Sequence, residues 1–129
     1  MERRRVVITG MGAISPIGNT VDEMWENARQ GNSGIDWVQG IDVPPDVNPV
    51  AGQVKNFDAD ERFGKREARR IDRVTQFALA ATEQALADSG LQITDENCYE
   101  IGCIIGTGIG GVQTISDTIL DYAARGERG

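Results

Sequence analysis

Two apolar runs that each lead into a glycine-rich turn constrain the fold of this chain most. The first run covers residues 5–9 and reaches Gly10 and Gly12, and the second covers residues 100–107 and reaches the glycines of residues 106–111. Short β-branched runs bounded by glycine are typical of buried strands. Glycine after a strand lets the backbone approach a ligand or a neighbouring element closely. The pattern therefore predicts an α/β protein with its chemistry at the strand ends.

Three helices are predicted between and after these runs. Thr20 and Glu23 have the spacing of a capping box, and the apolar stripe that follows predicts a helix that ends at Gly31. A long helix is expected from about Ile71 to the Ser89–Gly90 pair, and a final helix over residues 112–124 should bury its apolar face. Residues 31–60 look irregular, apart from a short strand near residues 52–55.

Composition excludes several classes of function. The net charge of −7 disfavours general nucleic-acid binding. No apolar stretch approaches the roughly 20 residues needed to cross a bilayer, and no secretory segment is recognisable, so we expect a cytoplasmic protein. The chain contains no histidine, which removes Ser–His and Cys–His pairs and the common zinc sites. Cys98 and Cys103 are predicted to be one loop thiol and one buried thiol, so no catalytic residue, metal or cofactor is assigned.

The glycine turns leave two interpretations open. The first has the form Gly-x-Gly-x-x-Ser, which lacks the third glycine of a dinucleotide fingerprint, and Pro16 interrupts the helix that should follow. A small stand-alone module that binds a nucleotide or phosphate is nevertheless an alternative. In the second turn, tight packing and close approach to a ligand are equally compatible with four glycines, and Ile109 is the one large side chain there.

Basic residues gather in an otherwise acidic chain. Six of the 13 positive charges lie within twelve positions: Arg62, Lys65, Arg66, Arg69, Arg70 and Arg73. Four of these arginines have the spacing of one side of a helix. One interpretation is a solvated face balanced by nearby Glu61, Glu67 and Asp72. We favour the other interpretation, a docking patch for an acidic partner or a phosphate.

The predicted sheet is too small to cover its own apolar edges. The two strands at residues 5–9 and 100–107 and the short one near residues 52–55 fall short of the four to six that an open sheet usually has. We therefore expect residues 1–129 to be the front part of a larger domain, inactive alone.

Six stretches of the chain resemble the amino-terminal part of β-ketoacyl-acyl carrier protein synthases, most closely the type II elongation enzymes of fatty acid synthesis. They are RRVVITGMGAISPIGNTVDEMW, GNSGI, AGQVKNFD, KREARRIDR, ALADSGL and IGCIIGTGIGG. The resemblance implies part of a thiolase-like fold with αβαβα layers, in a subunit that forms a homodimer. It also implies decarboxylative Claisen condensation of malonyl-acyl carrier protein with an acyl-enzyme thioester. The cysteine and two histidines of that chemistry have no counterpart in these residues.

Two roles follow from the resemblance. Arg66, Arg69 and Arg70 match the basic positions that such synthases present to the acidic helix of acyl carrier protein. Ile109 matches the residue that lines and gates the acyl-chain pocket near the dimer interface. A non-catalytic partner subunit of a polyketide-type synthase is a further alternative, because the residues that would distinguish it lie outside these stretches.

Overall fold

The computed structural model describes residues 3–41 and 43–126, which divide into two units. The first unit contains the described residues up to Phe57 together with Ala80–Gln92. The second contains Asp58–Leu79 together with the described residues from Ile93 onward. No helix in the described part of the chain is long and apolar enough to span a membrane.

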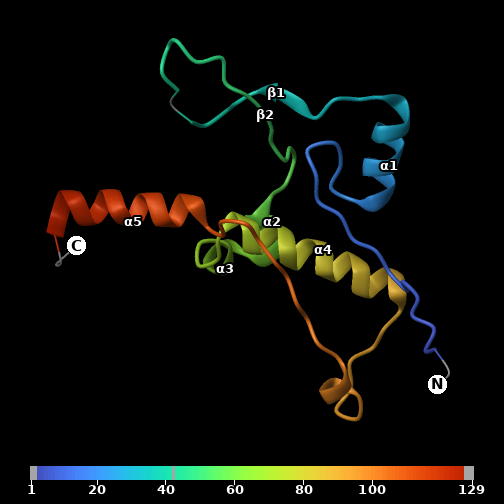
Figure 1. Ribbon diagram of the computed structural model, residues 1–129. Coiled ribbons are helices and arrows are strands. Elements are labelled where there is room, and N and C mark those ends of the chain that lie inside the picture. The colour runs from blue at the N-terminus through green and yellow to red at the C-terminus, as the bar shows by residue number, and fades with distance from the viewer. Residues whose placement is uncertain (1–2, 42, 127–129) are drawn as a thin grey trace. The chain divides into compact units, whose positions relative to one another are not determined.

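In the first unit, helix α1 (Val21–Gln30) begins and ends where the sequence predicts (Figure 1). The Thr20 hydroxyl accepts a hydrogen bond from the backbone N–H of Glu23 at 3.2 Å. The Glu23 carboxylate in return accepts from the N–H of Asn19 at 2.8 Å, one residue earlier than in a standard capping box. Gly31 ends the helix with φ +73°, a left-handed conformation that glycine adopts without a Cβ clash.

A two-stranded antiparallel hairpin interrupts the region that looked irregular. Strand β1 (Ile35–Trp37) pairs with β2 (Val50–Gly52), and Asp36 lies opposite Ala51. The Lys55 ammonium, just beyond β2, contacts the Asp36 carboxylate at 2.8 Å. The strand predicted near residues 52–55 therefore exists but lies about two residues earlier in the chain.

The first glycine turn packs directly against helix α4 (Arg73–Ser89), as Figure 1 shows for its C-terminal half. A Cβ atom on Gly12 would lie 2.8 Å from the carbonyl carbon of Ala81 and 2.9 Å from the nitrogen of Ala85. A Cβ atom on Gly10 would lie 2.6 Å from the nitrogen of Ser89. Glycine here serves close approach to a neighbouring helix, one of the two uses that the sequence allowed.

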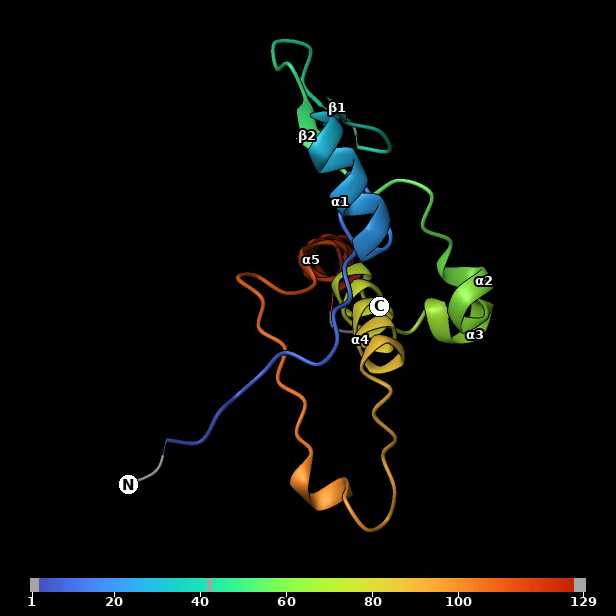
Figure 2. The ribbon, with the colours of Figure 1, turned by 90° about the vertical axis from the view of Figure 1, so that its right-hand side faces the viewer.

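The second unit begins with the short helices α2 (Ala59–Phe63) and α3 (Lys65–Ala68), which pack together (Figure 2). Gly64 joins them with φ +78°. A 3₁₀ turn, η1 (Cys98–Glu100), and helix α5 (Val112–Arg125) complete the unit. Gly126 follows α5, as the sequence predicts. Among the described residues, the buried side chains are Ala68, Ala80 and Gln76, so small residues dominate the interior.

The two strands predicted at residues 5–9 and 100–107 are not formed. Neither segment pairs with any other described segment, and their side chains are open to solvent, with Val6 90% and Ile104 98% exposed. A strand requires a neighbour that satisfies its backbone donors and acceptors. Without such a neighbour, the β-branched composition alone does not produce a ladder.

The burial predicted for the final helix and for one thiol is also wrong. On α5, Ile115, Ile119 and Leu120 are 51%, 62% and 65% exposed, because no described element covers that face. Cys103 is exposed, since the strand expected to bury it is absent, and Cys98 is half-buried in η1. Neither cysteine forms a disulfide.

Candidate functional site

The arginine-rich segment is a turn between two helices instead of one helical face. Arg66 lies on α3, Arg69 is the residue that ends α3, and Arg73 is the first residue of α4. The arginine spacing of one helical side therefore does not correspond to one helix, because the chain leaves helical geometry at residues 69–72, and the long helix expected from about Ile71 begins at Arg73. We call residues 66–73 the arginine turn.

The arginine turn presents its charge to solvent. Arg66, Arg69 and Arg70 are all exposed. Arg70 makes a long, exposed contact of 4.0 Å with Glu67, a type of ion pair that contributes little to stability. The Arg73 guanidinium lies over the Phe77 ring, 4.7 Å from its centroid. The structure therefore leaves most of this positive charge available to a partner.

A buried amide holds the turn in this conformation. The Gln76 side chain is only 8% exposed, and its Nε2 donates to the carbonyl of Ala68 at 2.9 Å and to that of Ile71 at 3.3 Å. Both carbonyls belong to the break between α3 and α4, where helical partners are missing. Gln76 supplies those partners, which explains why the break is stable.

Ile109 lies in the same unit, in the loop that leads into α5. We call residues 106–111 the glycine loop. Ile109 is 74% exposed, and no described atom lies within 4 Å of a Cβ added at Gly106, Gly108 or Gly110. Gly110 has φ +80°, and its N–H donates to the Thr107 hydroxyl at 3.1 Å. The loop is thus open around Ile109 in the described part of the chain.

Asp72 connects the arginine turn with the start of α5. Its carboxylate accepts a hydrogen bond from the Thr114 hydroxyl and lies against Gly111, where it occupies the space that a Cβ would need. The sequence suggested only that Asp72 balances nearby arginines on a solvated face. Its contact with a segment about 40 residues later depends on tertiary structure, so charge patterning did not reveal it.

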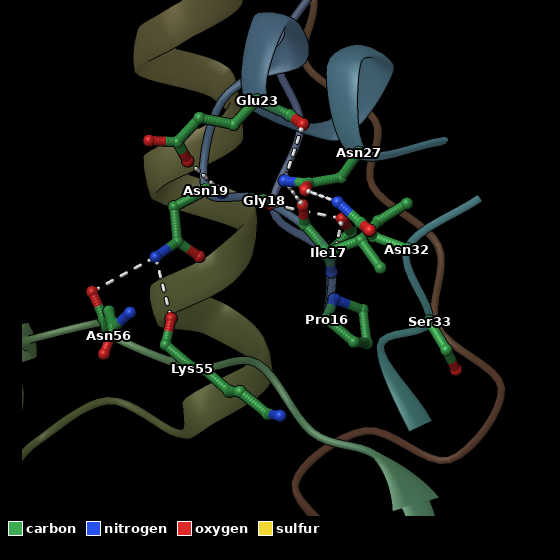
Figure 3. A pocket seen from close by; sticks show the side chains of 11 residues that line it. Pro16, Ile17, Gly18, Asn19, Glu23, Asn27, Asn32, Ser33, Lys55 and Asn56 are labelled. Atoms are coloured by element: carbon green, nitrogen blue, oxygen red, sulfur yellow. Dashed lines mark hydrogen bonds between the residues drawn. The ribbon is translucent and has the colours of Figure 1, made fainter. Parts of the chain in front are cut away.

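A polar hollow of about 420 Å³ lies in the first unit, between α1 and the segment that follows β2 (Figure 3). The Asn19 side-chain amide donates to the carbonyls of Lys55 and Asn56 at 2.8 and 3.1 Å. Asn27 likewise donates to the carbonyl of Ile17 at 2.8 Å. The side-chain amides of Asn19 and Asn27 thus hydrogen-bond to backbone carbonyls of neighbouring segments. The hollow contains no pair of nucleophile and base.

The first glycine turn gives the phosphate-binding alternative no support. Two of its amides already have partners, since Met11 N–H donates to the Asp88 carboxylate at 2.8 Å and Ala13 N–H donates to the Gln84 side-chain oxygen at 3.2 Å. A carboxylate at this position would also repel a phosphate. These contacts bind the turn to α4.

Perturbed carboxylates lie outside both predicted sites. The Arg29 guanidinium, followed by the Gln30 amide, lowers the pKa of Glu26 through hydrogen bonds. The Lys55 ammonium, followed by the Trp37 N–H, lowers the pKa of Asp36. Both are exposed surface pairs. No cluster of three metal-ligating side chains occurs within residues 3–41 and 43–126.

Comparison with known proteins identifies the family. The family model of the beta-ketoacyl synthase N-terminal domain matches residues 3–128. A protein of Staphylococcus aureus (strain N315) named 3-oxoacyl-[acyl-carrier-protein] synthase 2 is 50% identical over 127 residues. Proteins of the same name from Synechocystis sp. (strain ATCC 27184 / PCC 6803 / Kazusa) and Vibrio harveyi are 43% and 47% identical, over 93% and 89% of this chain.

This chain spans only about a third of these relatives. It covers 31% of the Staphylococcus protein, 29% of the Synechocystis protein and 28% of the Vibrio protein, whereas the first alignment includes 98% of this chain. A solved structure named "The ishigamide ketosynthase/chain length factor" matches with a TM-score of 0.78 at 30% identity. That match covers 97% of this chain and 31% of the other. The fold is the N-terminal portion of a thiolase-like α/β fold, and the chain belongs to the β-ketoacyl synthase family.

Proposed function

We propose that these residues are the N-terminal portion of a synthase that elongates acyl chains in fatty acid biosynthesis. The observation that carries the proposal is the match to the β-ketoacyl synthase N-terminal domain over residues 3–128. In the proposed reaction an enzyme cysteine takes the acyl group from acyl carrier protein and releases the carrier thiol. Malonyl-acyl carrier protein then loses carbon dioxide, and the resulting carbanion attacks the thioester carbonyl and expels the cysteine thiolate. None of the described residues is assigned to this chemistry.

Further polypeptide would complete the site in this proposal. Val6, Ile8, Ile104 and Ile105 are more than half exposed, although their composition is that of buried strands. Large apolar side chains gathered on open segments indicate a surface that other elements cover. We therefore propose that the remainder of the synthase supplies the pairing strands, the reacting cysteine and the surface of a homodimer.

The arginine turn is the proposed docking site for acyl carrier protein. Three of its exposed arginines, Arg66, Arg69 and Arg70, are the proposed contacts, and they lie in a chain whose net charge is −7, so the positive potential is local. An acidic helix is the partner that such a patch attracts and orients. The rigid turn held by Gln76 fixes the spacing of the arginines before the partner arrives.

Charge reversal tests this docking site in the full-length synthase. The triple change Arg66→Glu, Arg69→Glu and Arg70→Glu should raise KM for the carrier-bound substrate at least about tenfold at low salt, and the effect should shrink near 1 M salt, where the Debye length is about 3 Å. A matched triple reversal elsewhere on the exposed surface is the control: Arg4→Glu, Arg29→Glu and Arg125→Glu. Equal KM values for the two triple variants would refute the docking site.

Ile109 is the proposed residue that lines the acyl-chain pocket. It is the large aliphatic side chain of an open glycine loop, 74% exposed among the described residues. Each methylene that the pocket buries contributes about 0.8 kcal/mol, so the volume at this position should decide which chain lengths bind. Ile109→Phe should shorten the accepted chain, whereas Ile93→Phe, on an exposed segment earlier in the chain, should leave the product profile unchanged. An unaltered profile in Ile109→Phe would remove this assignment.

A non-catalytic partner subunit is the second candidate. The name of the solved relative includes a chain length factor together with a ketosynthase, and that match covers nearly all of this chain. Incubation of the full-length protein with a radiolabelled acyl thioester separates the two functions. A condensing subunit should retain covalent label on a cysteine, and a partner subunit should not.

A further inference from the structure

The carboxylate of Asp72, a residue of the arginine turn, contacts the end of the glycine loop, and the proposed function treats these two segments separately. Asp72 belongs to the arginine turn, one position before Arg73. Its carboxylate accepts a hydrogen bond from the hydroxyl of Thr114, a residue in the first turn of α5. The same carboxylate lies against Gly111, the last residue of the glycine loop. The segment that presents arginines to solvent is therefore in contact with the segment that carries Ile109.

The rest of the arginine turn is too well held to move independently of Asp72. The backbone carbonyl of Asp72 accepts from the N–H of Gln76 at 2.9 Å, which begins the hydrogen bonding of α4. The side chain of Gln76 holds the carbonyls of Ala68 and Ile71 on the other side of the break. A displacement of the turn by a docked partner would therefore include the Asp72 carboxylate.

The glycine loop, in contrast, has little of its own to fix it. Three of its glycines have open space around them, and within residues 106–111 the Gly110 N–H donates to the Thr107 hydroxyl. At the end of the loop, the carbonyls of Gly110 and Gly111 accept from the N–H groups of Val112 and Ile115 at 3.0 Å. Glycine allows many backbone conformations, so the position of Ile109 depends on how the end of the loop is held. The contact of Asp72 with Gly111 and Thr114 is at that end.

We propose that Asp72 is a positioning residue that anchors the glycine loop to the arginine turn, so that carrier-protein docking and the placement of Ile109 are coupled. The coupling rests on the proposed docking of acyl carrier protein at the arginine turn, whereas the anchoring does not. A carboxylate suits this role because hydrogen bonds to a charged acceptor are about twice as strong as neutral ones. Asp72 acts through Thr114 and Gly111 and is not assigned any contact with the reacting atoms.

Hydrogen exchange of the full-length synthase tests the anchoring first, without any partner. Thr114→Val removes the donor at nearly constant volume, and the amides of residues 106–112 should then exchange about tenfold faster, because loss of a hydrogen bond to a charged group weakens local structure. Thr114→Ser should restore the slow exchange. Thr118→Val is the matched control, since Thr118 lies one turn later and bonds only to the carbonyl of Thr114 among the described residues. Equal exchange in Thr114→Val and the native protein would overturn the anchoring.

Addition of acyl carrier protein then tests the coupling. In the native synthase, exchange should slow at residues 65–72 and also at residues 106–112, and Thr114→Val should retain only the first effect. Slowing confined to residues 65–72 in the native protein would overturn the coupling and leave the docking proposal intact. Slowing at neither segment would refute the docking and, with it, the coupling. As a functional readout, Thr114→Val should broaden the product chain lengths at unchanged KM for the carrier, and Thr114→Ser should restore the native profile.

Discussion

Gly12 is the position where a single added methyl group should reveal how the N-terminal segment is held. An alanine Cβ would overlap the backbone carbonyl of Ala81 and would lie 2.9 Å from the nitrogen of Ala85. Both groups belong to the hydrogen-bonded backbone of α4, which cannot move aside as a flexible side chain could. The segment would therefore have to move away from the helix, stretching the flanking bonds from Met11 and Ala13.

Two opposing terms determine the size of the effect. Overpacking of this kind costs about 1–3 kcal/mol. Gly12 does not have positive φ, so alanine can adopt its backbone conformation, and the reduced entropy of the unfolded chain returns about 0.4–1 kcal/mol. The steric term wins, and the net loss of unfolding free energy for Gly12→Ala should be about 1–2 kcal/mol.

Urea unfolding followed by circular dichroism measures this loss. With a slope of about 1–3 kcal/mol per molar urea, the midpoint for Gly12→Ala should fall by about 0.3–2 M. Gly102→Ala is the control, because its Cβ meets no described atom within 4 Å and its φ is not positive. Its midpoint should stay the same or rise slightly. A Gly12→Ala midpoint at or above that of Gly102→Ala would refute the packing argument.

Three further changes test local structure. Thr20→Ala should lower the unfolding free energy by about 1 kcal/mol, because the N–H of Glu23 loses its acceptor, whereas Thr20→Ser should not; equal losses would contradict the cap. Lys55→Gln should raise the pKa of Asp36 toward its ordinary value of 3.8 in an NMR titration. Because the native pKa of Asp36 is lowered, the stability that the Asp36–Lys55 pair contributes is fully present above pH 3.8 and is lost as the pH falls through the native pKa. Hairpin stability that does not change over this pH range would contradict this expectation. Gln76→Leu should lower the unfolding free energy by about 1–3 kcal/mol, because the carbonyls of Ala68 and Ile71 lose their donor. An unchanged urea midpoint in this variant would show that Gln76 does not stabilise the turn.

Elements with local signals were predictable from the sequence. The cap at Thr20, the left-handed Gly31 and the glycine at the end of α4 each depend on residues within one turn of a helix. The basic cluster over residues 62–73 was likewise evident from the positions of the charges, whereas the choice of Arg66, Arg69 and Arg70 within it came from the family resemblance. At the helix ends, the groups that pair with each other are neighbours in the sequence, so the sequence pattern was sufficient to predict the local structure.

Features that need a distant partner were not predictable. Ile8 and Ile104 have the composition of buried strands, yet both are at least 85% exposed, because no described segment pairs with them. The turn between α3 and α4 was not predicted, because it depends on Gln76 binding the carbonyls of Ala68 and Ile71, a contact that helical periodicity does not indicate. The role of Asp72 was missed for the same reason, since its partner Thr114 lies 42 positions away.

The overlap between the Asp72 carboxylate and the space beside Gly111 implies that these two positions cannot vary independently. A larger residue at position 111 requires either a shorter side chain at position 72 or rotation of the Asp72 carboxylate away from its partner Thr114, so a substitution harmful in one background should become tolerable in another. A saturation library covering both codons should accordingly recover alanine at 111 mainly together with glycine, alanine or serine at 72. Such paired substitutions would show that the arginine turn and the glycine loop are in close contact at these two positions.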